Sequence, residues 1–403
     1  MVNIAILGFG TVGSGVAEVL TKNSGLIDGR VNNQVRLKYI MRARDIFEGP
    51  YKDLFVKDFS TIEHDPEVGI VVETIGGVGA ALDYTTRALK AGKSVVTANK
   101  ELVATHGYEL LQLAKEHGVS YLFEASVGGG IPILRPLNAC LAANEVDQVT
   151  GILNGTTNYI LTRMIKAGLT FDQALKEAQA NGYAEQDPTA DVEGHDACRK
   201  TCILAALSFG QHVYPDQVPT QGIRGVSLAD VAYADSCGYK IKLLGRAIRQ
   251  PEGKVCAFVA PHLVADTAPL AGVEDVFNAI MVDGNATGEV MFYGKGAGKL
   301  ATASAVVADM LDSIEHRDRR RRIMWGDGSK KLLRPLDTLR SAWYVRFKGA
   351  REDIESILPV ESLSEPVEGV FVVQTSKIPT AEMDAAAEKL NAVGKVCAAM
   401  RIL

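Results

Sequence analysis

Cysteine is scarce in this sequence, and its spacing argues against several classes of protein. Six cysteines occur among 403 residues, none in a C-x-x-C pair and none near a histidine at zinc-finger spacing. We therefore expect reduced thiols, with neither a disulfide framework nor a zinc finger. Cys198 and Cys202 stand four residues apart and could share a soft metal ion, but two thiolates alone make a poor site.

Long apolar runs and an excess of one charge are missing as well. No stretch approaches ~18 uninterrupted apolar residues, and the N-terminus MVNIAILGFG lacks the basic start of a secretory signal. The net charge is -5, so the chain as a whole has no attraction to nucleic acid or to an anionic membrane. The basic run Arg317–Arg322 has no interleaved aromatic residue, which favours a solvated helix end. We expect a cytoplasmic protein with small-molecule partners.

The N-terminus is typical of a dinucleotide-binding domain. Val2–Leu7 is almost wholly apolar, as in a strand buried on both faces, and it leads through GFGTVG into a predicted helix at Val12–Leu20. A second apolar strand is predicted at Val35–Met41. A lone G-x-G-x-x-G is a weak signal, but this strand–turn–helix–strand context is the one that it requires. The predicted phosphate-binding residues are Gly8, Gly10, Thr11, Val12 and Gly13.

Basic residues after the second strand bear on the choice of cofactor. An acidic residue there would accept the ribose hydroxyls of NAD, but the sequence has Arg42-Ala43-Arg44. Arginine suits the 2′-phosphate of NADP, whereas solvated loop arginines are the alternative. Lys57 is a weaker second candidate for the same phosphate. The sequence thus favours NADP and leaves NAD possible.

Strand and helix patterns continue to alternate through the first third of the chain. The predicted strands are Gly69–Glu73, Ser94–Thr97 and Val119–Phe123, and the predicted helices are Ala80–Ala91 and Gly107–His117. This rhythm predicts a doubly wound parallel sheet with ligands at the carboxyl ends of its strands. Candidate cofactor residues in those loops are Thr74, Gly76, Thr97, Asn99 and Lys100. Position alone leaves open whether Lys100 faces a substrate or lies solvated in a first helical turn.

Three successive glycines follow Glu124, in the stretch Glu124–Pro132. They indicate a sharply bent backbone with free carbonyls, which beside one carboxylate could hold a monovalent cation. From the sequence alone, a plain tight turn before a helix at Pro132–Ala142 is favoured.

The pattern changes after Glu145 and indicates a second domain. A strand is predicted at Val146–Leu153, a turn at Asn154–Asn158 and a helix at Tyr159–Ala167, and Thr170–Gln173 has the form of a capping box. Later strands at Lys240–Arg249, Val255–Val259, Ala279–Val282 and Glu289–Phe292 predict a mostly antiparallel or mixed sheet. The turn containing Gly296 and Gly298 precedes a helix at Leu300–Ile314, whose N-terminus could meet a phosphate or a nicotinamide.

The stretch Ala178–Lys200 is polar and strongly acidic. A helix beginning near Asp187–Pro188 would place Asp196 and Lys200 on one face, one turn apart. Such a pair is usually a solvated one, worth about 0.2–0.5 kcal/mol. Four acids, however, precede it with no base among them: Glu185, Asp187, Asp191 and Glu193. A cationic group on a ligand would relieve their repulsion.

The C-terminal residues have the parts of a small α/β module. Strands are predicted at Ala342–Lys348, Gly369–Gln374 and Val396–Leu403, with a helix at Thr380–Val393. The segment Gly349–Pro366 is too polar to predict a full extra core.

These motifs together resemble the homoserine dehydrogenase family. In the acidic stretch the residues at the family's spacing are Ala178, Gly182-Tyr183-Ala184, Asp187-Pro188, Asp191-Val192, Gly194, Asp196 and Lys200. The resemblance extends over Gly8–Gly13, Val95–Lys100, Gly151–Tyr159 and Gly296–Val306, and so over nearly all of residues 1–315.

The resemblance implies NAD(P)-dependent interconversion of L-homoserine and L-aspartate 4-semialdehyde, a step of threonine, methionine and isoleucine biosynthesis. It implies that Glu185 and Asp191 hold the substrate's amino group. The other implied substrate residues are Gly155, Thr156, Gly182, Tyr183 and Asp196. Lys100 and Lys200 would bracket the reacting oxygen; our hypothesis makes Lys200 the principal acid/base, although the sequence does not order the two. Glu124 and the carbonyls of Val127, Gly129 and Ile131 match a family sodium site.

The implied architecture has three parts and a homo-oligomeric assembly, dimer or tetramer. A Rossmann-type domain at residues 1–142 is completed by residues 294–325, an α+β substrate and dimerisation domain with a mixed sheet spans residues 143–293, and residues 326–340 link it to an ACT-like module at 341–403. We expect this module to be truncated. Its first loop, Lys348–Asp353, lacks the usual Asp-x-x-Gly, so feedback binding of threonine is doubtful.

Two other functions compete with this one. A non-catalytic NADP-binding sensor would make Asp196, Lys200 and Lys100 incidental, and a related dehydrogenase would act on another small amino acid. Reduction of NADP with L-homoserine, compared with L-aspartate, L-serine and no substrate, separates all three.

Overall fold

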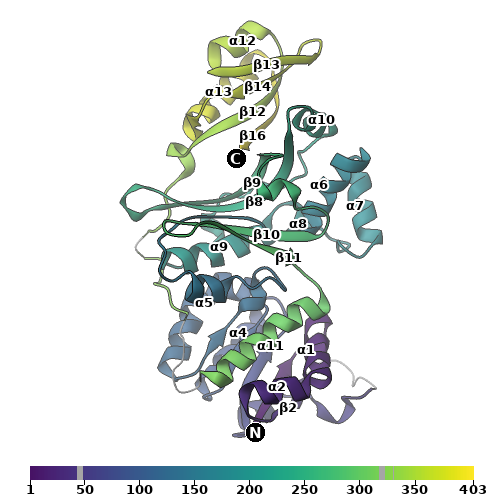
Figure 1. Ribbon diagram of the computed structural model, residues 1–403, viewed down its shortest axis with the longest axis vertical. Helices are drawn as coiled ribbons and strands as arrows, with labels where there is room; N and C mark the ends of the chain where they lie inside the picture. Colours follow the sequence, from purple (N-terminus) through teal and green to yellow (C-terminus); the bar gives the residue numbers. More distant parts are fainter. Residues whose placement is uncertain (43–48, 317–322, 330) are drawn as a thin grey trace. The chain divides into compact units, whose positions relative to one another are not determined.

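Figure 1 shows the computed structural model of the protein, which describes residues 1–42, 49–316, 323–329 and 331–403. The chain divides into two compact units, each assembled from three segments. The first comprises residues 1–147, 202–216 and 280–330, and the second comprises residues 148–201, 217–279 and 331–403. Arg44 and the basic run Arg317–Arg322 lie outside the described residues. The finer division, with a separate module at 341–403, stays a prediction.

The first unit contains a six-stranded parallel sheet in the order β3-β2-β1-β4-β5-β6. Its strands are β1 (Val2–Leu7), β2 (Val35–Met41), β3 (Phe55–Val56), β4 (Val68–Glu73), β5 (Ser94–Thr97) and β6 (Tyr121–Leu122). This order confirms the predicted doubly wound sheet. The strand order reverses between β1 and β4, and ligands of such sheets bind beyond the strand ends at that reversal.

Helices complete this unit: α1 (Thr11–Lys22), α2 (Ser24–Val31), α3 (Phe59–Glu63), α4 (Gly79–Lys90), α5 (Lys100–Glu116) and α11 (Lys299–Glu315). Although α11 is distant in sequence, Ala303, Val306 and Met310 on it share one core with Ile4 and Val16. The approach of α1 to α11 is close, because a Cβ on Gly15 would meet the Lys299 carbonyl oxygen at 2.7 Å.

In this unit one helix was missed and two local predictions need correction. The helix α2 was not predicted, because it contains two glycines and buries only Ile27, so it has no apolar periodicity. The strand predicted at Val119–Phe123 is limited to β6. The helix predicted at Pro132–Ala142 contains a π-helix, Pro136–Cys140, in which the Leu141 N–H donates to the Pro136 carbonyl five residues earlier.

A second sheet is mixed, as predicted, with the order β11-β10-β7-β8-β9-β16-β12-β14-β13 and with β15 beside β12. The strands before the C-terminal segment are β7 (Val146–Ile152), β8 (Tyr239–Arg249), β9 (Val255–Ala265), β10 (Phe277–Gly284) and β11 (Gly288–Lys295). Strands β8 and β9 pair antiparallel over their whole length. Strand β9 is therefore longer than the predicted Val255–Val259.

The helices between β7 and β8 are α6 (Gly155–Ala167), α7 (Phe171–Ala180), α8 (Thr189–Val192), α9 (His195–Phe209) and α10 (Leu228–Ser236). The capping box of α7 is confirmed, since the Thr170 and Gln173 side chains and backbones cap one another. Helix α10 was not predicted, although Ser227 and Asp230 form a second capping box at its start.

The C-terminal segment is an ordered run of strands and helices, and its description as a truncated ACT-like module stays a prediction. It runs β12 (Arg340–Lys348), α12 (Arg351–Ile357), β13 (Val360–Val367), β14 (Val370–Thr375), β15 (Ile378–Pro379), α13 (Thr380–Val393) and β16 (Lys395–Ile402). Apart from the two-residue β15, this is a β-α-β-β-α-β unit with the strand order β16-β12-β14-β13. The expectation that Gly349–Pro366 is too polar for a core was wrong, because Ile354 and Leu358 are enough to anchor α12 against the sheet.

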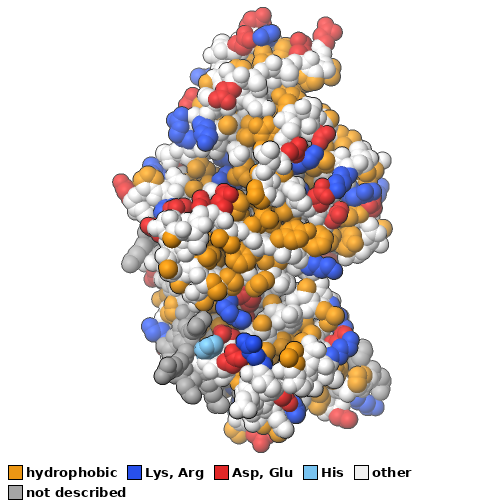
Figure 2. Space-filling model, viewed as in Figure 1, with side chains coloured by type: hydrophobic (Ala, Val, Ile, Leu, Met, Phe, Trp, Pro, Cys, Tyr) orange, Lys and Arg blue, Asp and Glu red, His pale blue; other side chains and the backbone are white. Residues whose placement is uncertain are grey.

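Two further observations concern the helices and the surface. None of the helices in the described parts of the chain is both long enough and apolar enough to cross a bilayer. Figure 2 shows apolar side chains gathered in the area where Figure 1 places β10 and β11. On the edge strand β11, Met291 is 39% exposed and Tyr293 is 53% exposed.

Candidate active site

The first glycine turn forms a close-fitting cradle at the carboxyl end of β1. Gly8 has a φ of +90°, and a Cβ there would meet the Thr74 carbonyl oxygen at 2.8 Å. A Cβ on Gly13 would lie 2.1 Å from the Gly8 carbonyl oxygen, whereas one on Gly10 would meet nothing within 4 Å. Because Gly10 caps α1 without any side-chain hydrogen bond, the first N–H groups of α1, from Thr11 and Val12 on, have no side-chain cap. This arrangement fits a pyrophosphate.

The neighbouring loops are held together by a residue that the sequence did not single out, Glu73 at the end of β4. Its carboxylate is fully buried and accepts from the Ile75 N–H at 2.7 Å and from the Thr97 hydroxyl at 2.6 Å. Thr74 is fixed separately, because its hydroxyl donates to the carbonyls of Leu7 and Gly8. Glu73 thus joins the loops after β4 and β5, which contain the predicted cofactor residues Thr74, Gly76, Thr97 and Asn99.

Lys100 is the first residue of α5, directly beyond the end of β5. The helix begins seven residues before the predicted Gly107, because the Asn99 side chain caps it by accepting from the Leu102 N–H at 3.1 Å. The Asn99 amide also donates to the Gly77 carbonyl at 2.6 Å. Asn99 therefore fixes the start of α5, and with it the backbone of Lys100, to the loop that follows β4.

The second glycine turn lies against the triple-glycine loop. The Gly130 N–H donates to the Lys295 carbonyl at 3.2 Å, and a Cβ on Gly129 would approach the Gly296 carbonyl oxygen to 2.4 Å. Gly298, with a φ of +126°, caps α11 without a side-chain hydrogen bond. Only glycine fits the close approach at position 129, so the two loops pack directly against one another within the first unit.

The basic residues proposed for the adenosine end lie beyond β2. The Arg42 backbone is fixed by a hydrogen bond from its N–H to the Val56 carbonyl, and Lys57 is exposed just after β3. Arg42 and Lys57 thus follow adjacent parallel strands. Arg44 lies outside the described residues.

Glu124 is buried, and its carboxylate accepts hydrogen bonds from a turn of backbone. One carboxylate oxygen accepts from the N–H groups of Ile133 and Leu134, at 2.6 and 2.8 Å, and the other accepts from the Arg135 N–H at 2.7 Å. In the described chain the carbonyl oxygens of Val127, Gly129 and Ile131 accept no hydrogen bond. No cluster of three or more His, Cys, Asp or Glu side chains suited to a metal occurs among the described residues.

In the second unit, Asp196 and Lys200 lie one turn apart on α9, as the sequence predicted. The helix begins at His195 and not near Asp187, because α8 ends at Val192 and Gly194 has a φ of +84°. The Lys200 amine donates to an Asp196 carboxylate oxygen at 2.8 Å and to the Leu153 carbonyl at 2.7 Å. Both side chains are buried, at 4% and 7% exposure, so this is no solvated surface pair.

Asn154 joins this pair to Asp191, although the sequence analysis gave Asn154 no role. Its amide nitrogen donates to an Asp191 oxygen at 2.7 Å and to the Asp196 oxygen that also binds Lys200, at 2.9 Å. The two carboxylates come from α8 and α9, and Asn154 precedes α6. The carboxylates and the lysine are thus gathered around the start of α6.

The remaining predicted substrate residues lie at the same end of α6. The Thr156 hydroxyl donates to the Tyr183 carbonyl at 2.6 Å, which fixes the loop containing Gly182. Gly155 is required by packing, since a Cβ there would meet the Val276 carbonyl oxygen at 2.8 Å. The Tyr183 ring is 44% exposed and lies 4.9 Å from the Tyr159 ring.

The acids near Asp191 do not form the unbalanced cluster that the sequence suggested. Glu193 is paired with Arg224 at 2.6 Å, so a compensating base exists, 31 residues further along the chain. Glu185 is exposed, and its carbonyl accepts from the Gln179 side chain at 3.0 Å. Asp187 accepts hydrogen bonds from the Thr189 hydroxyl and from the Thr189 N–H, the latter at 3.1 Å, and these two bonds lower the pKa of its carboxyl.

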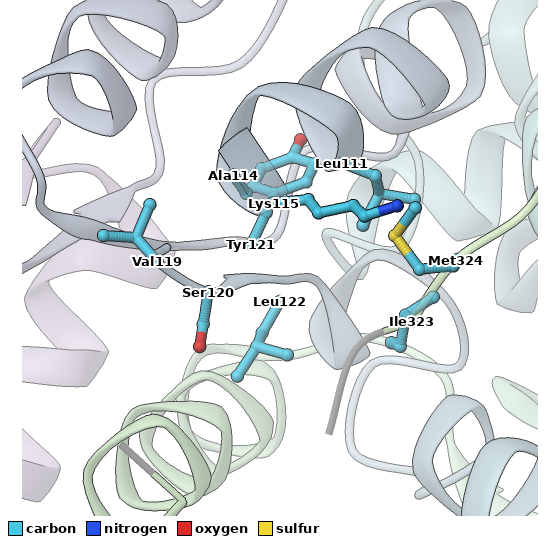
Figure 3. Close-up of a pocket in the computed structure, with 9 residues that line it drawn as sticks. All are labelled: Leu111, Ala114, Lys115, Val119, Ser120, Tyr121, Leu122, Ile323 and Met324. Carbon is cyan, nitrogen blue, oxygen red and sulfur yellow. The ribbon is translucent and has the colours of Figure 1, made fainter. Parts of the chain in front are cut away.

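Figure 3 shows a pocket in the first unit that is distinct from these groups. It lies between α5, β6 and residues 323–324, and it is lined by Leu111, Ala114, Lys115, Val119, Ser120, Tyr121, Leu122, Ile323 and Met324. Its volume of about 10 Å³ holds at most one water molecule. It is too small for an amino acid or a nicotinamide.

Comparison with known proteins gives a consistent result over most of the chain. Residues 8–124 match the family described as homoserine dehydrogenase, NAD binding domain, and residues 132–311 match the family described as homoserine dehydrogenase. A curated homoserine dehydrogenase from Synechocystis is 44% identical over 320 residues, covering 78% of this chain and 73% of that protein. One from Neisseria gonorrhoeae is 39% identical over 380 residues, covering 90% and 86%.

Solved structures agree with the sequence matches. A homoserine dehydrogenase from Thiobacillus denitrificans superposes with a TM-score of 0.92 at 35% identity, covering 100% of this chain and 98% of that one. A hyperthermophilic archaeal homoserine dehydrogenase in complex with NADPH has a TM-score of 0.66 at 28% identity, covering 80% and 99%.

Proposed function

Since the chain belongs to the homoserine dehydrogenase family, and is an oxidoreductase with a nicotinamide cofactor, we propose that it interconverts L-homoserine and L-aspartate 4-semialdehyde with Lys200 as acid/base. The observation that carries the proposal is the buried Asp196–Lys200 pair beside the start of α6. The pathway would be that of threonine, methionine and isoleucine.

A nicotinamide cofactor held at the glycine turn of Gly8, Gly10 and Gly13 would supply the hydride acceptor for oxidation of homoserine and the hydride donor for reduction of the aldehyde. Lys200 handles the accompanying proton. Asp196 favours the ammonium form of Lys200, which is the form that donates a proton to the oxygen during reduction of the aldehyde. In the opposite direction a neutral amine takes the hydroxyl proton, so alkaline pH favours oxidation of homoserine.

Charged groups around α6 suit the rest of the substrate. Asp191 is half-buried and would face the substrate ammonium, with the exposed Glu185 as a second carboxylate. Lys100, in the first unit, would assist by orienting the reacting oxygen. The assay compares NADP reduction by L-homoserine with that by L-aspartate and L-serine. Activity with homoserine alone supports the proposal; none with any substrate would favour a sensor, and activity only with another substrate a related dehydrogenase.

The preferred cofactor is proposed to be NADP, with NAD as a weaker alternative. Support comes from Arg42 and Lys57, which follow neighbouring strands at the adenosine end. Because a hydrogen bond to a charged group contributes about 1.5–3 kcal/mol, Arg42→Asp should lower the NADP to NAD ratio of kcat/KM by about 10- to 100-fold. An unchanged ratio would remove Arg42 from the proposal.

A sodium site is proposed at the triple-glycine loop. The carbonyls of Val127, Gly129 and Ile131, which accept no hydrogen bond in the described chain, are suitable oxygen ligands. The Glu124 carboxylate fits less well, because three N–H groups occupy it, and we assign it to holding the loop. Replacing sodium by choline at constant ionic strength should lower the unfolding temperature if the site exists.

A homo-oligomer, dimer or tetramer, is proposed on the exposed apolar side chains of β11. Met291 and Tyr293 lie on an edge strand, which natural proteins tend to cover or pair. Light scattering of the intact protein gives the assembly, and Tyr293→Lys should weaken it if this strand lies in the interface.

A further inference from the structure

Asn154 uses its whole hydrogen-bonding capacity on groups of two different kinds. Its side-chain oxygen caps α6, accepting from the Thr157 N–H at 2.8 Å and from the Thr157 hydroxyl at 3.0 Å. Its amide nitrogen donates at 2.7 Å to Asp191 and at 2.9 Å to Asp196. An asparagine side chain has two donor hydrogens and two acceptor lone pairs, so all four are engaged. The residue is buried, at 5% exposure.

The cap alone does not account for asparagine at this position. Serine, threonine and aspartate cap helices about as well, because each offers an oxygen to the first N–H groups. Only asparagine can cap with its oxygen and donate from a nitrogen on the same group to two carboxylates. Aspartate would add a third negative charge beside Asp191 and Asp196, and serine would leave at least one of them without its donor. We call the two hydrogen bonds from the Asn154 amide nitrogen to Asp191 and Asp196 the bridge. The bridge, and not the cap, requires asparagine at this position.

The bridge reaches the proposed acid/base directly. The Asp196 oxygen that accepts from Asn154 is the one that accepts from Lys200, at 2.8 Å. The Lys200 amine also donates to the carbonyl of Leu153, the residue before Asn154. These two acceptors of the Lys200 amine are thus positioned by two consecutive residues that directly follow β7.

From this geometry we propose that Asn154 is a positioning residue for catalysis. It holds Asp191 and Asp196 together despite their like charge, which aims Asp191 at the substrate ammonium and fixes Asp196 against Lys200. It also shares the negative charge of Asp196, which limits how strongly that carboxylate retains the Lys200 proton. The proposal rests on the proposed function, and it assigns Asn154 no contact with the substrate.

Two substitutions separate the bridge from the cap. Asn154→Asp is isosteric and keeps the capping oxygen, but it replaces both donors by a carboxylate. Asn154→Ser keeps a capping oxygen and loses the two-way bridge. Thr170→Ala, which removes the cap of α7 at a distance from these groups, is the matched control for loss of a cap.

The expected results differ in direction as well as in size. Because a hydrogen bond to a charged group is worth about a 10- to 100-fold effect, both Asn154 variants should lower kcat/KM for homoserine by that factor and leave the KM for NADP unchanged. The pH at which oxidation of homoserine reaches half its maximum should rise. Without the hydrogen bond from Asn154, the Asp196 carboxylate stabilises the ammonium form of Lys200 more strongly. Asn154→Asp, which adds a negative charge near Lys200, should show the larger rise of the two variants. Thr170→Ala should lower the unfolding temperature and leave the kinetics as in the wild type.

Other outcomes would overturn the proposal. If Asn154 only caps α6, then Asn154→Asp keeps wild-type kcat/KM and pH dependence, because aspartate is an equally good cap. If wild-type enzyme fails to oxidise homoserine at all, it is the proposed function that fails. The bridge is then decided by crystal structures of the wild type and Asn154→Ser, in which the Asp191 and Asp196 carboxylates should move apart in the variant; unchanged carboxylates would refute it.

Discussion

The second unit contains two buried ion pairs that look alike in composition and differ in what surrounds them. Asp196 pairs with Lys200 at 2.8 Å, and Asp230 pairs with Arg346 at 2.7 Å. Both carboxylates are buried, at 4% and 0% exposure. Asp230 also accepts from the Tyr344 hydroxyl at 2.7 Å and from the Ser227 hydroxyl at 2.6 Å. It therefore fastens α10 to β12 of the C-terminal segment.

The difference lies in the cation. Burial of Asp230 opposes its ionised form, but hydrogen bonds from Arg346, Ser227 and Tyr344 outweigh burial and lower its pKa. Arginine does not give up its proton in proteins, so this cluster has one charge state and serves as a fastening. A lysine amine can exchange its proton, and the Asp196 pair stands beside the predicted substrate residues. Of two similar buried pairs, only the one with lysine is suited to acid/base chemistry.

Lys200→Arg should have the largest effect on activity, because it makes the cation of the Asp196 pair the same as that of the Asp230 pair. The variant keeps the positive charge beside Asp196 but cannot give or take a proton at working pH, so kcat should fall by about 10²- to 10⁴-fold. Steady-state kinetics with homoserine and NADP measure this. Circular dichroism and the unfolding temperature should stay near the wild type. A Lys200→Arg or Lys200→Ala enzyme with near-wild-type kcat would refute the acid/base assignment.

Arg346→Met should lower the stability of the protein and leave its activity unchanged. It leaves the Asp230 carboxylate buried without its cation, which in other proteins costs about 3–5 kcal/mol of unfolding free energy. Urea unfolding measures the loss. Tyr344→Phe, which removes one hydrogen bond from the same carboxylate and keeps its cation, is the milder control, at about 1.5–3 kcal/mol. Per folded molecule, kcat should be unchanged; a fall in kcat without any loss of stability would place this cluster in the chemistry.

Lys242 offers a third kind of buried cation, one held by neutral groups. It lies on β8 at 1% exposure, and its amine donates to the Val273 carbonyl and lies 3.4 Å from the Asn158 side-chain oxygen. Burial lowers its pKa from 10.5 to about 8. The folded protein therefore binds fewer protons than the unfolded chain between pH 8 and 10.5, and this contribution to stability rises with pH across that window.

The measurement compares wild type with Lys242→Met from pH 7 to 10.5. The difference in unfolding free energy between the two should move in favour of the wild type as the pH rises, by up to about 3 kcal/mol. Taking the difference removes the titration of the other lysines and tyrosines. A pH-independent difference would show that Lys242 is not neutralised by burial.

Local patterns in the sequence predicted much of the framework. Strands β2 and β5 have the predicted bounds, and Asp196 and Lys200 lie one turn apart as expected, because apolar runs and helical spacing are local signals. Helix α10 could have been predicted from its Ser227–Asp230 capping box. The starts of α5 and α6 were placed too late, since Asn99 and Asn154 were not recognised as caps.

The parts that were missed depend on contacts between residues far apart in the chain. Asn154 meets carboxylates 37 and 42 residues away, and Glu193 meets Arg224 31 residues away. Glu73 resembled the polar end of a strand until its contact with Thr97 placed it between two loops. The periodicity of the sequence contains no information on contacts between distant residues, so these pairs could be found only in the folded structure.

The smallest effect is expected from a pair that shares its chemistry with the Asp230 cluster and lacks its burial. Arg351 and Glu355 lie 2.8 Å apart at an i,i+4 spacing on α12, with side chains 62% and 48% exposed. Water screens their attraction, and ordering two long side chains opposes it, so such exposed pairs contribute little. Arg351→Ala should therefore leave the urea midpoint and the homoserine kinetics within error of the wild type. If Arg351→Ala lowered the free energy of unfolding nearly as much as Arg346→Met, burial would not be what distinguishes the two arginine pairs. The difference between the Asp196 and Asp230 pairs would then depend only on whether the cation is lysine or arginine.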